Sequence, residues 1–319
     1  MTNPARGRAS HATWGLLCLL APTAVAAQSV RDVVAASRLG AGYAQLINLG
    51  ATSDISSSNL DVSDGDSRSS IDILRLPYSA AFWSLTPDTD LYWRVSGNYL
   101  RMKDSTDTSL LGNGPGSITS RWSAYSVTGG LSARRRLGNG FTVEPAFDAG
   151  VARLLNDANY SGGAAVLQPL LDGVLVNWHT NAWMATPSVG LGWSRTFAQT
   201  RTVNIRAHVA WTWVNSFGES DPVLRFRETA GTYSVRAEYV APLGMAVAGR
   251  ALNYVTEAGY GGLFGGSRDA LGFTTIAEVG LGVEVPVRQT PQSTRVSVGA
   301  SYLFGPDVRG WSFKLALVY

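Results

Sequence analysis

The chain ends with the sequence WSFKLALVY, residues 311–319, and this stretch decides the fold class. Its odd-numbered residues are all large and apolar: Trp311, Phe313, Leu315, Leu317 and Tyr319. Because side chains alternate between the two faces of a strand, these residues share one face, which suits lipid better than a mixed protein core. The length also fits, since about nine to eleven tilted residues cross a bilayer. An edge strand of a soluble sandwich has a similar pattern, so the rest of the chain must decide between the two.

The amino-terminal residues indicate export from the cytoplasm. Arg6 and Arg8 precede an apolar run over residues 14–20, and Ala24-Val25-Ala26 forms a small-x-small cleavage pattern. This is typical of a secretory signal peptide, which we place at residues 1–27. The only cysteine, Cys18, lies inside that run, so we expect no disulfide and no cysteine-based metal site in the mature chain. Loss of the two arginines takes the formal charge from +3 to +1, which gives no reason to expect a nucleic-acid partner.

An alternation of apolar and other residues recurs along the chain. The clearest case is residues 203–213, where Val203, Ile205, Ala207, Val209, Trp211 and Trp213 share one face over eleven residues. The other matches are residues 74–82, 91–99, 125–133, 141–151, 183–193, 231–239, 245–255, 277–285, 296–304 and 311–319, with a first strand near residues 42–50. The total is twelve strands, an even number, as a closed bacterial barrel needs.

The predicted connections alternate in length. Short turns lie at residues 86–88, 138–140, 198–200 and 242–244 and around Pro291. Longer links lie between them, at residues 52–68, 104–119, 156–179, 216–228 and 257–270. Outer-membrane barrels have short periplasmic turns, long external loops and a periplasmic carboxyl terminus, and a Greek-key sandwich has no reason to keep this order. We therefore predict an all-β, antiparallel, up-and-down transmembrane barrel over residues 41–319.

Aromatic residues and the segment before the barrel add two further expectations. In this orientation Trp183, Trp211, Trp213, Phe304 and Trp311 fall near the outer rim, and Phe82, Phe141, Trp193, Tyr239 and Tyr319 near the inner one, as two interfacial girdles. In residues 28–40, Ser29 and Asp32 have capping-box spacing and three valines form a stripe, which predicts a short helix. Such a helix needs a surface, and small inward residues such as Gly190, Gly280 and Gly299 offer one, so we predict a plug in the lumen.

The chemical candidates are charged residues on the predicted inward face. They are Arg94, Glu144, Asp148, Arg206, His208, Arg236, Glu238, Arg250, Glu278, Glu284 and Lys314, all expected to line the lumen. Both signs are present, which fits ion pairs across the lumen and, as an alternative, a selectivity filter. We expect no catalytic site, because His179 and His208 lack the His-x-Ser spacing of outer-membrane lipid hydrolases. No residue pattern predicts a metal or another cofactor, since the Asp61, Asp64, Asp66 group lacks the glutamate of a calcium loop.

A signal peptide, a short helix and twelve strands ending in an aromatic residue resemble the translocator domain of autotransporters. Almost nothing precedes the helix in the mature chain, so the resemblance is to the solitary outer-membrane autotransporter-like barrels, which have no passenger domain. The stretches that look similar are residues 74–78, 169–173, 177–179 and 187–190. This resemblance implies a structural or transport role in the Gram-negative outer membrane. The alternatives are a narrow, porin-like solute channel and, less favoured, an outer-membrane lipid hydrolase.

The same resemblance implies which partners to expect. They are outer-membrane lipid, lipopolysaccharide and the barrel-assembly machinery, which would read Trp311, Phe313, Leu315, Leu317 and Tyr319 as a carboxyl-terminal assembly signal. We expect the barrel to be a monomer.

Overall fold

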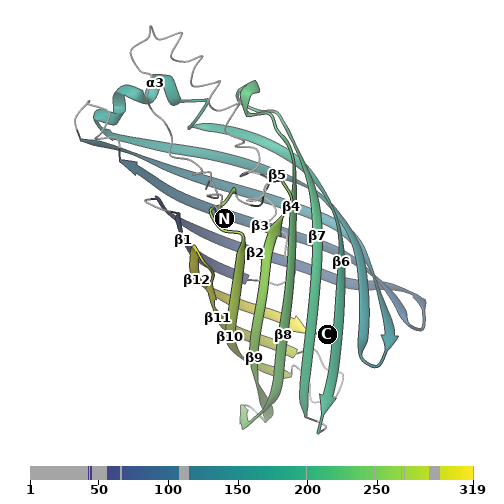
Figure 1. Ribbon diagram of the computed structural model, residues 1–319. Helices are drawn as coiled ribbons and strands as arrows, with labels where there is room; N and C mark the ends of the chain where they lie inside the picture. Colours follow the sequence, from purple (N-terminus) through teal and green to yellow (C-terminus); the bar gives the residue numbers. More distant parts are fainter. Residues whose placement is uncertain are drawn as a thin grey trace, which may run out of the picture.

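The fold is a closed antiparallel barrel of twelve strands, seen in a computed structural model (Figure 1). The structure describes Gly42, Ala44 and residues 56–64, 67–107, 115–198, 200–247, 249–266, 268, 270–286 and 295–318. Each strand pairs with its neighbours in the chain, and β1 closes the barrel on β12. The predicted fold class and strand number are confirmed. No helix among these residues is long and apolar enough to span a membrane.

The strands differ widely in length. Their bounds are β1 Ser56–Asp64, β2 Ser67–Thr86, β3 Thr89–Asp107, β4 Gly116–Gly138, β5 Phe141–Gly162, β6 Trp178–Phe197, β7 Arg201–Phe217, β8 Arg227–Val247, β9 Arg250–Phe264, β10 Thr275–Pro286, β11 Arg295–Phe304 and β12 Val308–Val318. Short helices η2 (Gly163–Leu167) and α3 (Gln168–Leu171) lie between β5 and β6, and η3 (Pro222–Leu224) lies between β7 and β8. In Figure 1 α3 lies at the upper end of the barrel, and the β6–β7 and β8–β9 turns lie at the lower end.

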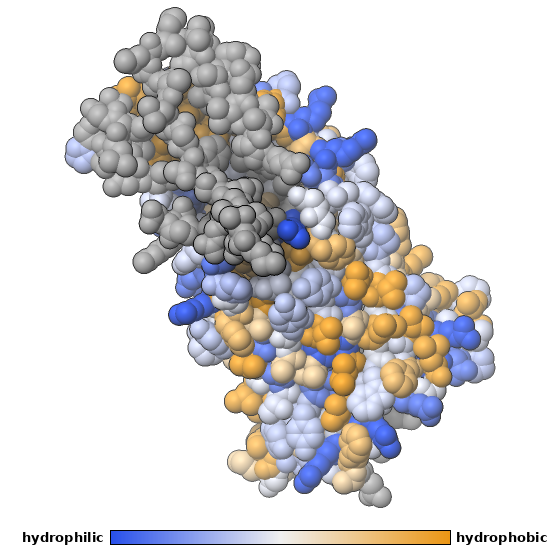
Figure 2. All heavy atoms as spheres, viewed as in Figure 1, coloured by the Kyte–Doolittle hydropathy of each residue, from blue (hydrophilic) through white to orange (hydrophobic). Residues whose placement is uncertain are grey.

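The outward face of the wall is apolar. Leu281 is 70% exposed, Phe313 63% and Leu131 60%. Exposing so many large apolar side chains to water would be unfavourable. Their even spacing along strands and their exposure agree with a wall that faces lipid. Figure 2 shows the apolar residues gathered over the middle and lower part of the visible wall, with hydrophilic residues above and below.

Short turns join the strands at the lower end, largely as predicted. Residues 87–88 join β2 to β3, and Asn139 with Gly140 join β4 to β5. Asn139 has φ 51° and Gly140 φ 83°, the left-handed backbone that a tight hairpin needs and that these two residues accept most readily. The predicted turn at Pro291 lies outside the described residues.

Three predicted boundaries are wrong. Gly42 and Ala44 are helical, and the first strand is β1, inside the link that we expected at residues 52–68. Its apolar Leu60 and Val62 point inward, while Asn59, Asp61 and Ser63 are exposed on the other face. This is the reverse of a lipid-facing strand, and it hid β1 from the pattern search. Residues 242–244 are not a turn, because β8 continues through Gly244 to Val247, with a register shift between Pro242 and Ala246.

The external connections also differ from the prediction in length. Only two residues separate β1 from β2, and three separate β11 from β12, although both connections lie on the side of the long loops. Four long connections remain, between β3 and β4, β5 and β6, β7 and β8, and β9 and β10. The long loops therefore gather on one side of the outer rim.

Candidate functional site: the barrel lumen

The outer half of the lumen is filled by apolar side chains. Ile71, Leu100, Leu154 and Val214 come from four different strands, and each is at most 2% exposed. The rings of Trp122 and Trp178 meet edge to face with their centroids 5.4 Å apart. Because an interior of this kind excludes water, this part of the lumen is a packed core and offers no aqueous path through the residues that form it.

The external connections complete this apolar cluster. Leu224 and Phe226 come from the β7–β8 connection, and Leu271 and Phe273 from the β9–β10 connection, all within the same buried cluster. Ala44, from the segment before β1, is fully buried in it. Residues of two external connections and Ala44 thus pack into the outer half of the lumen.

The inner half of the lumen is polar, and most of its charges are in ion pairs. On β5 the apolar Ala152 and Leu154 lie toward the external loop, while Asp148 and Glu144 lie toward the short turn. Arg94 on β3 lies 3.2 Å from Asp148, and Arg134 on β4 lies 2.8 Å from Glu144. Paired charges of this kind stabilise the barrel by avoiding an unpaired charge in a partly dry interior.

A second charged cluster spans β8 to β12. Lys314 Nζ lies 2.6 Å from Glu257 Oε1 and 3.1 Å from Glu278 Oε2, and Arg236 Nε donates to Glu278 Oε1 at 2.7 Å. Ser301 Oγ donates to the same oxygen of Glu257. The side chains of Lys314, Glu257 and Glu278 are only 10–12% exposed, so the network is largely shielded from bulk water.

Glycines on the inward face make room for this second cluster. A Cβ atom at Gly280 would overlap the carboxylate of Glu257 and the hydroxyl of Ser301, and one at Gly259 would overlap the carboxylate of Glu278. Small residues were predicted here as a surface for the helix of residues 28–40. That helix lies outside the described residues. The space beside Gly259 and Gly280 is occupied by the carboxylates of Glu278 and Glu257, and Ala44 packs in the outer half of the lumen.

Most of the predicted lumen residues lie on the inward face. Arg94, Glu144, Asp148, Arg236, Glu278, Glu284 and Lys314 are in ion pairs, and Glu284 accepts from Arg295 at 3.2 Å. The inward-facing positions of β7 and β8 include Arg206, His208 and Glu238. Arg206 lies opposite Arg236, and Glu238 lies opposite Glu257. The prediction that Arg250 lines the lumen is wrong. This residue is exposed beside the β8–β9 turn, and it lies on the same face of β9 as Tyr254 and Tyr260, which point outward.

Sequence reasoning missed three partners of these charges, namely Arg134, Glu257 and Arg295. Arg134 lies on the same inward face of β4 as Ser132, and Glu257 lies on the same inward face of β9 as Gly259. Extending the alternating pattern by a few residues would therefore have found Arg134 and Glu257. Glu257 was assigned to an external loop because β9 was expected to end before it. The strand continues to Phe264.

Three neighbouring strands of the lumen wall and the strand beside them bring an acid, a histidine and a serine, the residue types of a hydrolase triad, into one row. Glu144 and His208 lie on either side of Gly190, and His208 lies opposite Ser234. However, Glu144 already accepts from Ser132 Oγ at 2.8 Å and from Arg134. Among the described side chains no hydrogen bond joins His208 to Ser234, so this row lacks the geometry of a Ser-His-acid triad. The described residues also contain no cluster of three or more metal-ligating side chains.

Comparison with solved structures gives the same architecture. The β domain of the Bordetella autotransporter BrkA is 16% identical, with a TM-score of 0.52 over 82% of this chain and 94% of that one. The transport unit of the Escherichia coli autotransporter AIDA-I is 13% identical, with a TM-score of 0.54 over 87% of this chain and 98% of that one. The translocator domain of NalP from Neisseria meningitidis is 12% identical, with a TM-score of 0.51 over 89% and 95%. At these identities the likeness concerns the fold.

Comparison of the sequence with known families is more specific. No curated protein matches the sequence. The model of the family described as "Solitary outer membrane autotransporter beta-barrel domain" matches residues 49–319, which include every strand of the barrel. The chain therefore belongs to the solitary outer membrane autotransporter β-barrel domain family, whose members are outer-membrane proteins of Gram-negative bacteria.

Proposed function

We propose that this outer-membrane barrel is a translocator-type module of the solitary kind and that its lumen is closed at rest. The observation that carries the proposal is the apolar cluster in the outer half of the lumen. It joins wall residues such as Leu100 and Val214 to loop residues such as Phe273 and to Ala44. A barrel built for steady passage of ions or small solutes would need a polar, water-filled path at this level.

The paired charges of the inner half support the same proposal. Acidic and basic groups on different strands contact one another at 2.6–3.2 Å. An ion-selective filter would instead present groups of one sign to the lumen. We assign these residues a structural role and propose no enzymatic activity for the barrel.

Conductance in planar bilayers tests the proposal. The unmodified protein is expected to be silent, because the apolar cluster excludes hydrated ions. Ala44→Arg introduces a long charged side chain where none fits, so it should displace the segment and allow current. Ala44→Ser is the matched control, because its small hydroxyl leaves the packing almost unchanged, and it should stay silent.

Two outcomes decide between the proposal and its alternative. Steady ion-selective current through the unmodified protein would reject the closed translocator and favour the narrow solute channel. If Ala44→Arg prevents folding, which a lost heat-modifiable gel shift would reveal, a variant lacking residues 28–44 takes its place. Silence of a folded variant of either kind, with the amino-terminal segment displaced or removed, would show that this segment does not close the lumen.

A further inference from the structure

An outward-facing surface at the outer rim combines tryptophans, an amide and arginines. We call it the rim surface and define it by Trp183 on β6, Trp213 and Asn215 on β7, and Arg225 and Arg227 at the start of β8. Trp183, Asn215 and Arg227 are register partners on three adjacent strands, so their side chains form one row on the outside of the wall. Trp213 lies two residues closer to the short turns on β7.

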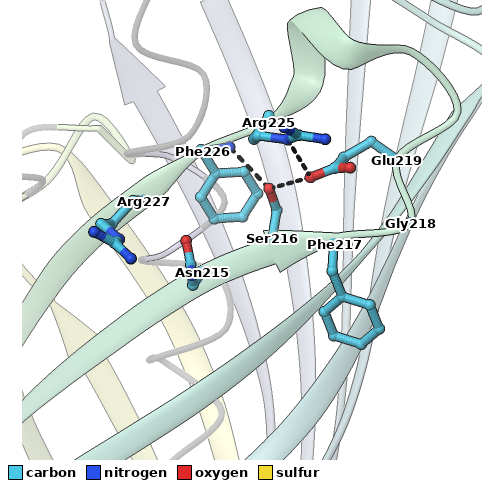
Figure 3. A pocket seen from close by; sticks show the side chains of 8 residues that line it. All are labelled: Asn215, Ser216, Phe217, Gly218, Glu219, Arg225, Phe226 and Arg227. Carbon is cyan, nitrogen blue, oxygen red and sulfur yellow. Dashed lines mark hydrogen bonds and ion pairs between the residues drawn. The ribbon is translucent and has the colours of Figure 1, made fainter.

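Two pockets meet at this row. One of about 620 Å³ is lined by residues 215–219 and 225–227, and the other, of about 610 Å³, includes Trp183, Trp213, Asn215 and Arg227. Asn215 and Arg227 line both pockets. Figure 3 shows these two side chains near each other on neighbouring strands, away from the ion pair of Arg225 with Glu219. The rim surface is therefore one continuous hollow with a polar upper part and an aromatic lower part.

The charge of the rim surface is positive. Arg227 is exposed and is in no ion pair with a residue that the structure describes. The side chain of Arg225 is 73% exposed and lies 3.6 Å from Glu219, whose own side chain is only 5% exposed. Arg153, on the outward face of β5, lies opposite Asn181, two residues from Trp183, and adds a third exposed cation nearby. Glu228 also lines the second pocket, but it lies opposite Val214, on the inward-facing side of β8, so Arg227 is the charged residue of this pocket on the outward face.

The rim surface also lies at a defined depth. Below Arg225 and Arg227 the outward wall is aromatic: the ring centroids of Trp211 and Phe264 are 5.4 Å apart, and those of Tyr233 and Phe264 are 6.4 Å apart. Such an aromatic band marks the boundary between hydrocarbon and headgroups. The exposed arginines stand on the external side of this band, at the level where the outer leaflet presents its headgroups. Arginine is the side chain best suited to phosphate there, because its planar fork of donors matches two phosphate oxygens.

We infer that the rim surface binds the phosphorylated headgroup of lipopolysaccharide. Arg225 and Arg227 contact phosphate, Asn215 donates to phosphate or sugar hydroxyl oxygens, and Trp183 and Trp213 pack against the upper part of the acyl chains. The aromatic part of the surface selects a lipid over free phosphate, which has no apolar portion to bury. The inference is independent of whether the lumen is open or closed, and it places one annular lipid on one side of the barrel.

Binding of fluorescent lipopolysaccharide to the purified, full-length barrel in detergent tests the inference. The double variant R225Q/R227Q removes both charges and keeps polar side chains of similar length. We expect it to weaken the affinity at least about tenfold, the scale for losing two charge-assisted contacts. Trp183→Ala is expected to weaken binding of the same lipid without changing the response to free inorganic phosphate. The titration is run with EDTA and again with Mg²⁺, which competes with the arginines for the phosphates.

A matched control comes from the other end of β6. Arg195 is also an exposed arginine, but it lies beside Phe197 near the inner rim. Arg195→Gln should leave the affinity unchanged, and a heat-modifiable gel shift of every variant checks that it folds. Equal affinity of the folded double variant and the unmodified protein would overturn the inference. Equal affinity for lipopolysaccharide and its dephosphorylated form would overturn it too, as would an equal loss in Arg195→Gln.

Discussion

Lys314 of the last strand lies 2.6 Å from Glu257, three strands away around the wall of the barrel. Its register partner on β11 is Gly299, which has no side chain to block the path. The lysine therefore reaches across β11 to Glu278 on β10 and to Glu257 on β9. This contact ties the closing strand to the part of the sheet that precedes it and belongs to a network that joins the five strands from β8 to β12.

Removing Lys314 should destabilise the barrel. Lys314→Ala leaves Glu257 and Glu278 close together with one cation fewer, and breaking a largely buried pair in this way costs about 3 kcal/mol. The measurement is the temperature at which the heat-modifiable gel shift is lost, which we expect to fall. Adding Glu257→Gln to Lys314→Ala should recover part of the loss, because it removes one of the uncompensated carboxylates. No recovery in the double variant would mean that the lysine acts through packing alone.

Adding one methyl group at Gly280 should also be costly. The new Cβ in Gly280→Ala would overlap the carboxylate of Glu257 and the hydroxyl of Ser301, and overpacking of this kind costs about 1–3 kcal/mol. The measurement is the urea midpoint of unfolding followed by tryptophan fluorescence. Gly97→Ala is the matched control, since a Cβ there meets nothing within 4 Å. Similar midpoints for the two variants would contradict the crowding seen at Gly280.

Acid should loosen the β7–β8 connection. Burial opposes ionisation of Glu219, but hydrogen bonds from Ser216 and a backbone N–H, together with Arg225, hold the pKa of the carboxyl below its usual range. A carboxyl with a lowered folded-state pKa stabilises the loop above its unfolded pKa of about 4, and this stabilisation is lost as the pH falls through the lower folded value.

The pH effect can be followed with a tryptophan placed at the end of β7, next to this connection. Phe217 is 46% exposed and adjoins this connection, so the fluorescence of F217W should report the change. We expect a transition below about pH 4 in F217W and none in F217W/E219Q. A transition of equal size in both would assign it to another group.

A charge on the outward face of β12 should impair insertion. Phe313 is 63% exposed on the wall and lies between Trp311 and Leu315 of the predicted assembly signal. Phe313→Lys is expected to cost about 2–4 kcal/mol near the bilayer midplane, while Phe313→Leu should cost little. The measurement is the folded fraction in lipid vesicles at increasing urea concentration. Equal stability of the two variants would argue that this face of β12 does not contact lipid.

The sequence by itself determined the strand pattern and the side of each loop. A period of two over residues such as Val203 to Trp213 follows directly from strand geometry, and a lipid-facing wall must repeat it on nearly every strand. That is why the fold class, the number of strands and the inward parity of most charges could be read from the residues alone. The pattern failed on β1, which has no apolar face toward the lipid. Its apolar residues Leu60 and Val62 point inward and belong to the apolar cluster.

Only the tertiary structure decided which charges meet and what fills the lumen. The contacts of Lys314 with Glu257 and Glu278 depend on barrel closure and on the register of four strands, which no local pattern encodes. The same holds for the apolar cluster, where Ala44, Leu224 and Phe273 come from three separate segments outside the strands. The size and polarity of each inward residue depend on which side chains lie opposite it in the lumen. The closed sheet decides this, because it sets the distance across the lumen.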